Sequence, residues 1–340
     1  LLSDRNLPLE GDGRTRGIQE LDRVFFQMNS GSVSAGLGDL DLVFDRTEFG
    51  RYRRQLQGAS LSVNRLEGEV SVFGAVSKGR WVTRRLVPVE GYQGPYRLEG
   101  GFGGTAGQVV AGSERVFLNG RLLHRGEGQD YIIDYDRGLL SFTPSQPIVG
   151  ESRVTVDYQY LSNGVRHRLM GVQSRVRLGE DQGHLGATFI RESDQALADV
   201  SLSGRPLVRH QVSVVDGAYS PVAGLQVSGE LAFSDRQGTS ANGQQIGDRA
   251  FRVGMNWMPQ PVRVGAYSLG KARFSGLFRK VGADFKSFEQ LNRVSKEGRW
   301  GWRSQSERGE ERVGEAAFEY AIREGVVLDL GYGQRTGNYP

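Results

Sequence analysis

Long segments of strict apolar–polar alternation constrain this sequence more than any other feature. In residues 225–234, apolar residues or glycine alternate with polar or small ones: Leu225, Val227, Gly229, Leu231 and Phe233 share one parity. Residues 166–178, 250–257 and 312–322 follow the same period of two. Successive side chains of a β-strand point to opposite faces, so the pattern predicts strands with one apolar and one polar face.

Residues 166–178 show the predicted division of faces most fully. One face carries Met170, Val172, Val176 and Leu178, and the other carries His167, Gln173, Arg175 and Arg177. Weaker alternation predicts further strands at 22–28, 32–44, 57–66, 69–76, 81–89, 272–285 and 326–332. Within 32–44, Gly36 and Gly38 indicate a bulge or a change of face. No sustained helix is expected; residues 194–200 could form one turn.

The same alternation suits a soluble antiparallel sheet with one wet face and a transmembrane β-barrel. Several segments reach the ~9–11 residues that a tilted strand needs to cross a bilayer, whereas many globular strands stop at ~5–6. Aromatic residues lie near the ends of predicted strands, at Trp81, Trp257, Tyr267, Tyr320 and Tyr332. Such residues form interfacial girdles in membrane barrels. We therefore predict an all-β fold, an antiparallel transmembrane β-barrel or part of one, with an inserted small β-module.

The connections support the same fold class. Glycine occurs 49 times and proline 10 times, which fits many strands and tight turns. Turns are predicted at 220–221, 235–248 and 259–261, and the longest loops at 237–247 and 286–312. Alternating short and long connections are typical of barrels with tight periplasmic turns and longer outer loops.

Residues 94–160 predict the compact module between the two runs of longer strands. Asn119-Gly120 joins two apolar runs and accepts positive φ at both positions, which indicates a type I′ hairpin. Residues 136–138 turn the chain between 131–135 and 139–143, which are rich in aromatic and β-branched residues. Residues 153–160 alternate as one strand with a single buried face.

This module resembles a known sequence pattern. The matching stretches are GPYRL at 94–98, GSERV at 112–116, LNG at 118–120, DYIIDY at 130–135 and SRV at 152–154. The pattern is similar to a module of large, poorly characterised outer-membrane β-barrel proteins of Gram-negative bacteria. It is less similar to segments of the translocon barrel of the gliding-motility secretion system. The resemblance implies a barrel in the bacterial outer membrane and supplies no functional residues.

The expected organisation has four parts. Residues 1–21 form an irregular lead-in, 22–93 the first barrel strands, 94–160 the module, and 161–340 the remaining barrel strands and loops. Because the chain starts at Leu1 and not at methionine, we expect it to be a mature fragment or a piece of a longer protein.

Composition excludes several function classes. There are no cysteines, so disulfides and thiolate metal sites are absent. The net charge of +4 is spread along the strands without a basic stripe, so no nucleic-acid partner is expected. No window approaches the ~20 apolar residues of a transmembrane helix. The expected partners are outer-membrane lipid and other envelope or secretion proteins.

Three sequence features suggest metal, nucleotide or catalytic sites only weakly. Asp130, Asp134 and Asp136 could ligate Ca²⁺, but the loop lacks the further ligands of an EF-hand, and a turn explains the aspartates. The glycine-rich residues 100–107 lack the following helix that a phosphate loop requires. The four histidines are His124, His167, His184 and His210, and no two of them have metal-ligand spacing. One of them could act as the base for a serine nucleophile such as Ser174, but the sequence has no G-x-S-x-G motif.

Arginine pairs and two tryptophans leave two interpretations open. Arg84 and Arg85, residues 51–54, and Arg175 with Arg177 could line a lumen and attract anions, or lie in solvated turns and at headgroup level. Trp300 and Trp302 could bind a glycan or anchor the chain at the interface, and we favour anchoring. We predict no catalytic residue, cofactor or metal site and no enzyme activity. The expected function is a structural, export or porin-like solute-passage role in the outer membrane. The alternative is a soluble or surface-exposed all-β binding or adhesion protein.

Overall fold

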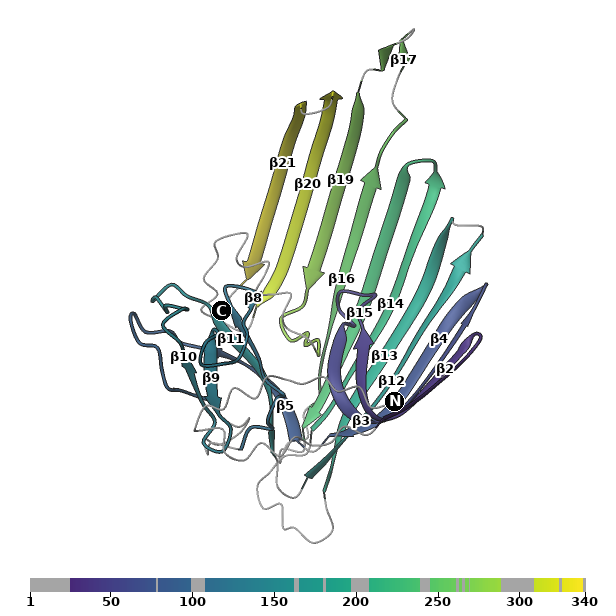
Figure 1. Cartoon of the computed structure of the whole chain (residues 1–340). Coiled ribbons are helices and arrows are strands. Elements are labelled where there is room, and N and C mark those ends of the chain that lie inside the picture. Colours follow the sequence, from purple (N-terminus) through teal and green to yellow (C-terminus); the bar gives the residue numbers. More distant parts are fainter. Residues whose placement is uncertain are drawn as a thin grey trace. The chain divides into compact units, whose positions relative to one another are not determined.

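The computed structural model describes residues 25–77, 79–98, 108–161, 165–179, 182–196, 208–238, 245–260, 263–264, 267–268, 270–288, 309–323 and 326–338 (Figure 1). Regular secondary structure in these residues is all β, and the named strand pairs are antiparallel, as expected. No helix in this part of the chain could span a membrane. The chain divides into two compact units, one built on a large sheet and the other on residues 78–163.

Twelve strands form the large sheet, in the order β1-β2-β3-β4-β12-β13-β14-β15-β16-β19-β20-β21. Neighbours in the sheet follow one another along the chain except at β4 and β12, which flank residues 78–164, and at β16 and β19, which flank β17 and β18. The strands are β1 (Phe25–Ser30), β2 (Val33–Phe44), β3 (Tyr52–Arg65), β4 (Gly68–Ser77), β12 (Val165–Leu178), β13 (Gly183–Ala196), β14 (Val208–Val222), β15 (Leu225–Gly238), β16 (Gln245–Trp257), β19 (Lys271–Val281), β20 (Glu310–Arg323) and β21 (Val326–Asn338). In the described residues nothing pairs β1 with β21, so this sheet is open and the expected closed barrel is not found.

Successive connections alternate between the two ends of the large sheet, because the strands run antiparallel. One end, here the hairpin end, carries the connections 31–32, 66–67, 179–182, 223–224, 258–270 and 324–325. The other, the connection end, carries 45–51, 78–164, 197–207, 239–244 and 282–309. The small hairpin of β17 (Arg263–Val264) and β18 (Tyr267–Ser268) belongs to the hairpin end. The connections of the hairpin end have two to four residues except for 258–270, and those of the connection end have six or more, so the predicted alternation of short and long connections holds except at 258–270.

The two faces of the large sheet differ in an unusual way. On β12, exposed and buried side chains alternate: Met170, Val172 and Val176 are exposed, while His167 and Gln173 are buried. The predicted membership of each face is therefore confirmed, and the apolar face is the exposed one. We call it the open face. The opposite face is polar toward the hairpin end and apolar toward the connection end, where segments 45–51 and 282–288 partly bury it, and we call it the covered face.

Several predicted boundaries need correction. Ser220 and Pro221 lie inside β14, and the turn falls at 223–224. Asp194, expected to start a helical turn, is in strand β13. In β2 the apolar residues change face around Gly38, whose φ is 107°, without any register shift against β3. A change of face, and not a bulge, is thus the correct alternative. The predicted lead-in 1–21 lies outside the described residues.

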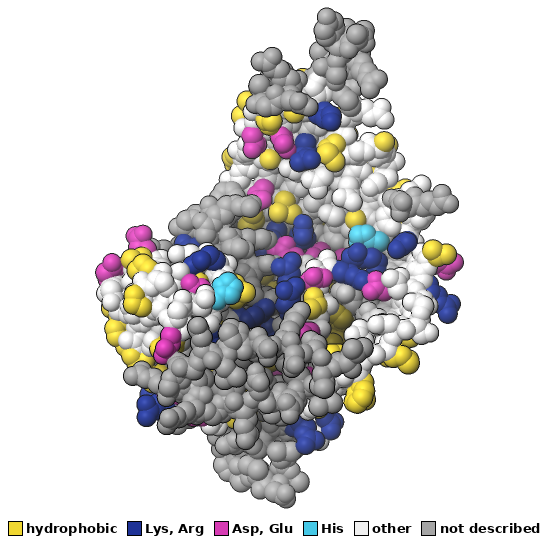
Figure 2. All heavy atoms as spheres, in the orientation of Figure 1, with side chains coloured by type: hydrophobic (Ala, Val, Ile, Leu, Met, Phe, Trp, Pro, Cys, Tyr) yellow, Lys and Arg dark blue, Asp and Glu magenta, His cyan; other side chains and the backbone are white. Residues whose placement is uncertain are grey.

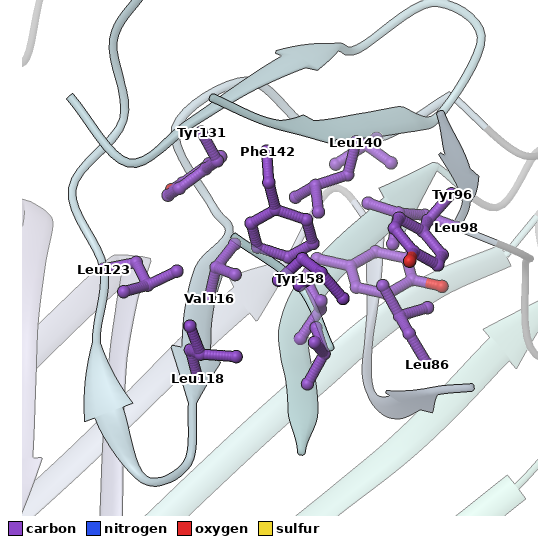
Figure 3. Packing of buried hydrophobic residues seen from close by; sticks show 14 residues of the cluster. Leu86, Tyr96, Leu98, Val116, Leu118, Leu123, Tyr131, Leu140, Phe142 and Tyr158 are labelled. Atoms are coloured by element: carbon purple, nitrogen blue, oxygen red, sulfur yellow. The ribbon is translucent and has the colours of Figure 1, made fainter. Parts of the chain in front are cut away.

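The module contains two small sheets around one core. The four-stranded sheet joins β5 (Gly79–Leu86), β11 (Val154–Leu161), β7 (Arg115–Leu118) and β8 (Arg121–Leu122). The three-stranded sheet joins β6 (Tyr96–Arg97), β10 (Leu139–Phe142) and β9 (Tyr131–Asp134). Figure 3 shows side chains from both sheets, among them Val116, Leu140, Phe142 and Tyr158, pointing toward one another. A continuous apolar core therefore holds the module together.

Two predictions about the module are corrected and two are confirmed. The strand predicted at 81–89 was placed among the barrel strands, but it is β5 and pairs with β11 along its whole length. Strand β11 is buried on both faces from Val154 to Gln159. Val156 and Tyr158 of one face lie in the core, and Asp157 of the other is bonded to Thr83 and Arg115. The Asn119-Gly120 hairpin, with φ values of 53° and 85°, and the turn at Gly138 are as predicted.

Candidate functional site on the covered face of the large sheet

A row of charged side chains crosses the covered face at a single register level. Cross-strand pairing aligns Glu69 on β4 with Arg175, and carries the row through Gly186 to Asp216, Glu230, Arg252 and Arg279. Six of the seven strands from β4 to β19 therefore contribute a charged side chain to the row. The seventh, β13, contributes Gly186. Figure 2 shows basic and acidic side chains intermixed on the visible face of this sheet.

The β2–β3 connection, residues 45–51, runs over this charged row as a strap. The Glu230 carboxylate accepts the backbone N–H groups of Glu48 at 2.8 Å and of Phe49 at 2.6 Å. A carboxylate that accepts two backbone donors satisfies groups that burial would otherwise leave unpaired. These bonds tie the strap to β15, 181 residues later in the sequence than Phe49.

Arg279 joins the strap to the far strands of the sheet. Its Nε donates to Glu48 Oε1 at 2.8 Å, and its Nη1 donates to Glu311 Oε1 at 2.7 Å. Arg252 adds a contact of 3.4 Å to the other oxygen of Glu48. The Arg279 guanidinium also lies 5.4 Å from the centre of the Phe49 ring. A buried guanidinium between two carboxylates is stable only as a complete set, since removing one partner leaves an uncompensated charge.

Aromatic side chains fill the space between the strap and the sheet. Phe49 is buried edge-on against Phe285, at 5.5 Å between ring centres, over Val212, Val214 and Ala232. Phe288 packs against Tyr52 and His210. The segments 45–51 and 282–288 thus close the covered face with a packed apolar layer on the connection-end side of the charged row.

On the hairpin side of the charged row the covered face is polar and hollowed. One cavity of about 250 Å³ is lined by Arg175, Arg177, His184 and neighbouring polar residues, and one of about 170 Å³ by Arg46, Glu69 and the same two arginines. Arg46 forms an ion pair with Glu69, and Arg175 lies 3.7 Å from Asp216. Two interpretations were given above for Arg175 and Arg177. In the structure both arginines lie on the covered face, on its polar hairpin side.

The contacts described for the histidine rings are to carboxylates, a backbone carbonyl and an aromatic ring. His167 Nδ1 lies 2.6 Å from Asp194 Oδ1, but both side chains are almost fully buried, at 1% and 4% exposure. His184 contacts Asp216 at 3.3 Å, and His210 Nε2 contacts the Lys286 carbonyl at 3.0 Å. Ser174 bonds the Ala187 carbonyl on the open face, and so lies on the other side of the sheet.

The other predicted candidates behave as turn and surface residues where they are described. Asp130 accepts the His124 N–H, Asp134 accepts the Arg137 N–H, and Asp136 accepts from Gln108. The described residues hold no group of three or more His, Cys, Asp or Glu side chains that could bind a metal ion. The glycine-rich residues 100–107, Trp300 and Trp302 lie outside the described residues.

The module has a buried polar cluster of its own. Glu114 Oε1 accepts hydrogen bonds from Tyr135 at 2.9 Å and Tyr131 at 3.3 Å, and lies 3.4 Å from Arg125. Burial raises the pKa of the Glu114 carboxyl, which its hydrogen bonds and Arg125 only partly counteract. The pKa values of Tyr131 and Tyr135 are also raised, chiefly by burial. No predicted candidate belonged to this cluster.

The comparisons with known proteins are sparse. Residues 81–162 match a family model described as a domain of unknown function (DUF8818). The match begins at Trp81, inside β5, and so agrees with the module limits in the structure and not with a start at 94. No curated protein matches the chain.

Proposed function

We propose that the large sheet is the wall of an integral outer-membrane β-barrel, with a structural, export or solute-passage role and no chemistry of its own. The observation that supports this most is the exposure of its apolar face. Soluble sheets turn apolar side chains inward, whereas here Val172, Leu231 and Val253 are more than 40% exposed. The opposite face is the buried one, and it holds both apolar residues such as Val212 and polar residues such as Glu230.

The extent of the apolar band supports a hydrocarbon environment. On β12 the open-face residues from Met170 to Leu178 include no charge. They span roughly 27 Å along the strand at ~3.4 Å per residue. After strand tilt this is comparable to the apolar band of about 25 Å in outer-membrane barrels. Open-face aromatics stack across the strands toward the hairpin end, with Trp257, Phe274 and Phe318 at 5.3 and 4.8 Å between ring centres.

Within this proposal the strap limits passage along the covered face. It fills the connection-end side with Phe49, Phe285 and Phe288 and leaves the hairpin side polar. A structural or export role with a restricted lumen therefore fits better than a wide, open pore. The catalytic alternative has no support from the geometry of the described histidines.

Two adjacent residues of β15 provide the test. Val227 lies on the open face and Gln226 on the covered face, and both are exposed. We expect Val227→Arg to lower insertion into phosphatidylcholine vesicles, since an arginine on the lipid face costs about 2–4 kcal/mol at mid-depth and less toward the interface, and Val227 lies between the middle of the apolar band and its hairpin end. Gln226→Arg should insert like the wild type. Equal insertion of the two variants, or a wild-type chain that stays folded and monodisperse without detergent, would favour the soluble binding protein instead.

A further inference from the structure

Four arginines form a compact basic patch on the open face near the connection end. They are Arg166 and Arg168 on β12, Arg191 on β13 and Arg209 on β14. Register places Ser193 between Arg168 and Arg209 in one row, and Arg191 opposite Met170 in the next row. Neighbouring arginines are therefore about 7–10 Å apart at the backbone. Arg166, Arg168 and Arg209 are exposed, and Arg191 is half-buried.

The basic patch lacks counter-charges within the described part of the chain. None of its arginines forms a salt bridge there, and Arg191 Nε is buried without a hydrogen-bond partner. The open face of β12, β13 and β14 carries no acidic residue. The nearest open-face carboxylate is Asp235 on β15, which pairs with Gln211 and so lies diagonally across from Arg209. Its Oδ2 accepts hydrogen bonds from Gln245 at 2.6 Å and Gln211 at 3.5 Å, and no salt bridge joins it to the patch in the described residues. The positive charge of the patch is thus left for a ligand outside the described residues.

The position of the patch identifies the chemistry that meets it. Its arginines begin where the apolar band ends: Arg168 precedes Met170 on β12, and Arg191 follows Phe189 on β13. If the apolar band lies in hydrocarbon, as in the proposed function on which this inference rests, the patch lies at the depth of the lipid headgroups. The hairpin end of the same face differs, since aromatic residues such as Trp257 and Tyr320 predominate there.

We propose that Arg166, Arg168, Arg191 and Arg209 form a binding site for phosphate-bearing lipid headgroups. The planar guanidinium donates two parallel hydrogen bonds to phosphate oxygens, and several arginines on adjacent strands surround one headgroup. An acidic protein partner would have to displace lipid from the hydrocarbon edge to reach the same side chains. The site makes the two rims of the sheet unequal, with a phosphate-binding rim at the connection end and an aromatic rim at the hairpin end.

Lipid titration of the full chain in detergent micelles tests the site. Short-chain phosphatidic acid, short-chain phosphatidylcholine and inorganic phosphate are added separately, and bound ligand is counted by native mass spectrometry. We expect phosphatidic acid to bind at least about tenfold more tightly than phosphatidylcholine, since each arginine near an anionic lipid surface contributes roughly a fivefold factor. Glutamine at all four positions should abolish the preference.

Single substitutions keep the test decisive if the fourfold variant does not fold. Arg168→Gln should weaken phosphatidic acid binding roughly fivefold. Arg177→Gln, on the same strand but on the covered face and equally exposed, should leave it unchanged. Equal affinity for both lipids, or an unchanged preference in Arg168→Gln, would overturn the site. Inorganic phosphate that binds as tightly as the lipid would identify a free-anion site and overturn the lipid assignment.

A vesicle experiment separates this inference from the function on which it rests. The wild-type chain is mixed with vesicles of phosphatidylcholine alone, which offer hydrocarbon but no net headgroup charge. Insertion into these vesicles without any preference for phosphatidic acid in the titration would reject the basic patch and leave the barrel proposal standing. Failure to insert would reject the barrel proposal itself, whatever the titration shows.

Discussion

Glu230 determines where the strap lies, because its carboxylate accepts the backbone N–H groups of both Glu48 and Phe49. In Glu230→Ala these buried donors lose their acceptor, which costs about 1–3 kcal/mol for each unsatisfied group. We expect the strap to detach more often, so that trypsin cleaves after Arg46 or Arg51 at least about tenfold faster, since 1.4 kcal/mol is a factor of ten. Ser228→Ala, on the same strand and face, is the control; equal cleavage of both variants would contradict the role of Glu230.

Glu114 should give the module a pH-dependent stability. Its folded pKa is raised above the ordinary value of 4.5, mainly by burial, so the folded module binds the proton more tightly than the unfolded chain does. Stability is therefore greatest below about pH 4.5 and falls as the pH rises through the folded pKa. Glutamine cannot titrate, so Glu114→Gln should lack this contribution to the change of unfolding free energy with pH. Amide exchange of β7 and β9, compared between wild type and variant at each pH, measures that free energy. The same pH dependence in both proteins would show that another group is responsible.

At the level of elements, Gly171 permits β12 to lie beneath a ring of the neighbouring strand. A Cβ at this position would overlap the Phe73 side chain, which stacks on Tyr52 at 5.8 Å and meets Phe44 at 5.3 Å. Gly171→Ala should therefore destabilise the large sheet by about 1–3 kcal/mol through overpacking. Gly74→Ala on β4 meets nothing within 4 Å and should be neutral. Urea unfolding midpoints compare the two, and equal midpoints would exclude the packing role of Gly171.

The strand faces could be predicted from the sequence because they depend only on a period of two. Leu231 and Glu230 occupy the predicted opposite faces of β15, as do Val253 and Arg252 on β16. The alternation does not reveal which face is covered, and polar residues were found on the buried side. Short-range turn chemistry was equally readable, as the Asn119-Gly120 hairpin shows. Both kinds of information are local.

The strap and the limits of the module could not be predicted, because they depend on contacts between distant residues. Nothing in residues 45–51 indicates that Glu48 meets Arg279, 231 positions later. Strand β5 alternates much as a barrel strand does, and only its pairing with β11 assigns it to the module. The available signals for the site were Glu230, which stands among smaller residues on a predicted polar face, and the pair Arg175 and Arg177.

For the whole molecule, the topology gives the insertion point of the module a definite side. Residues 78–164 leave β4 and rejoin β12 at the connection end, together with the other long connections, while the hairpin end has connections as short as two residues. In outer-membrane barrels the short turns are periplasmic and the long loops extracellular. Under the proposed function, the two points at which the module joins the sheet, at the ends of β4 and β12, therefore lie on the outer side of the membrane. The basic patch lies at the same end and would meet the outer leaflet.

The absence of cysteine makes this orientation directly measurable. Arg137 lies in an exposed turn of the module, with 78% of its side chain accessible, and Leu66 lies in the β3–β4 hairpin at 89%. We expect Arg137→Cys to react with a membrane-impermeant maleimide on intact cells, and Leu66→Cys to react only after the cells are broken. Both substitutions replace exposed side chains, so neither should disturb folding, and labelling of the two in lysed cells controls for their reactivity. Labelling of Leu66→Cys alone on intact cells would reverse the orientation, and equal labelling of both would show that no membrane separates Arg137 from Leu66.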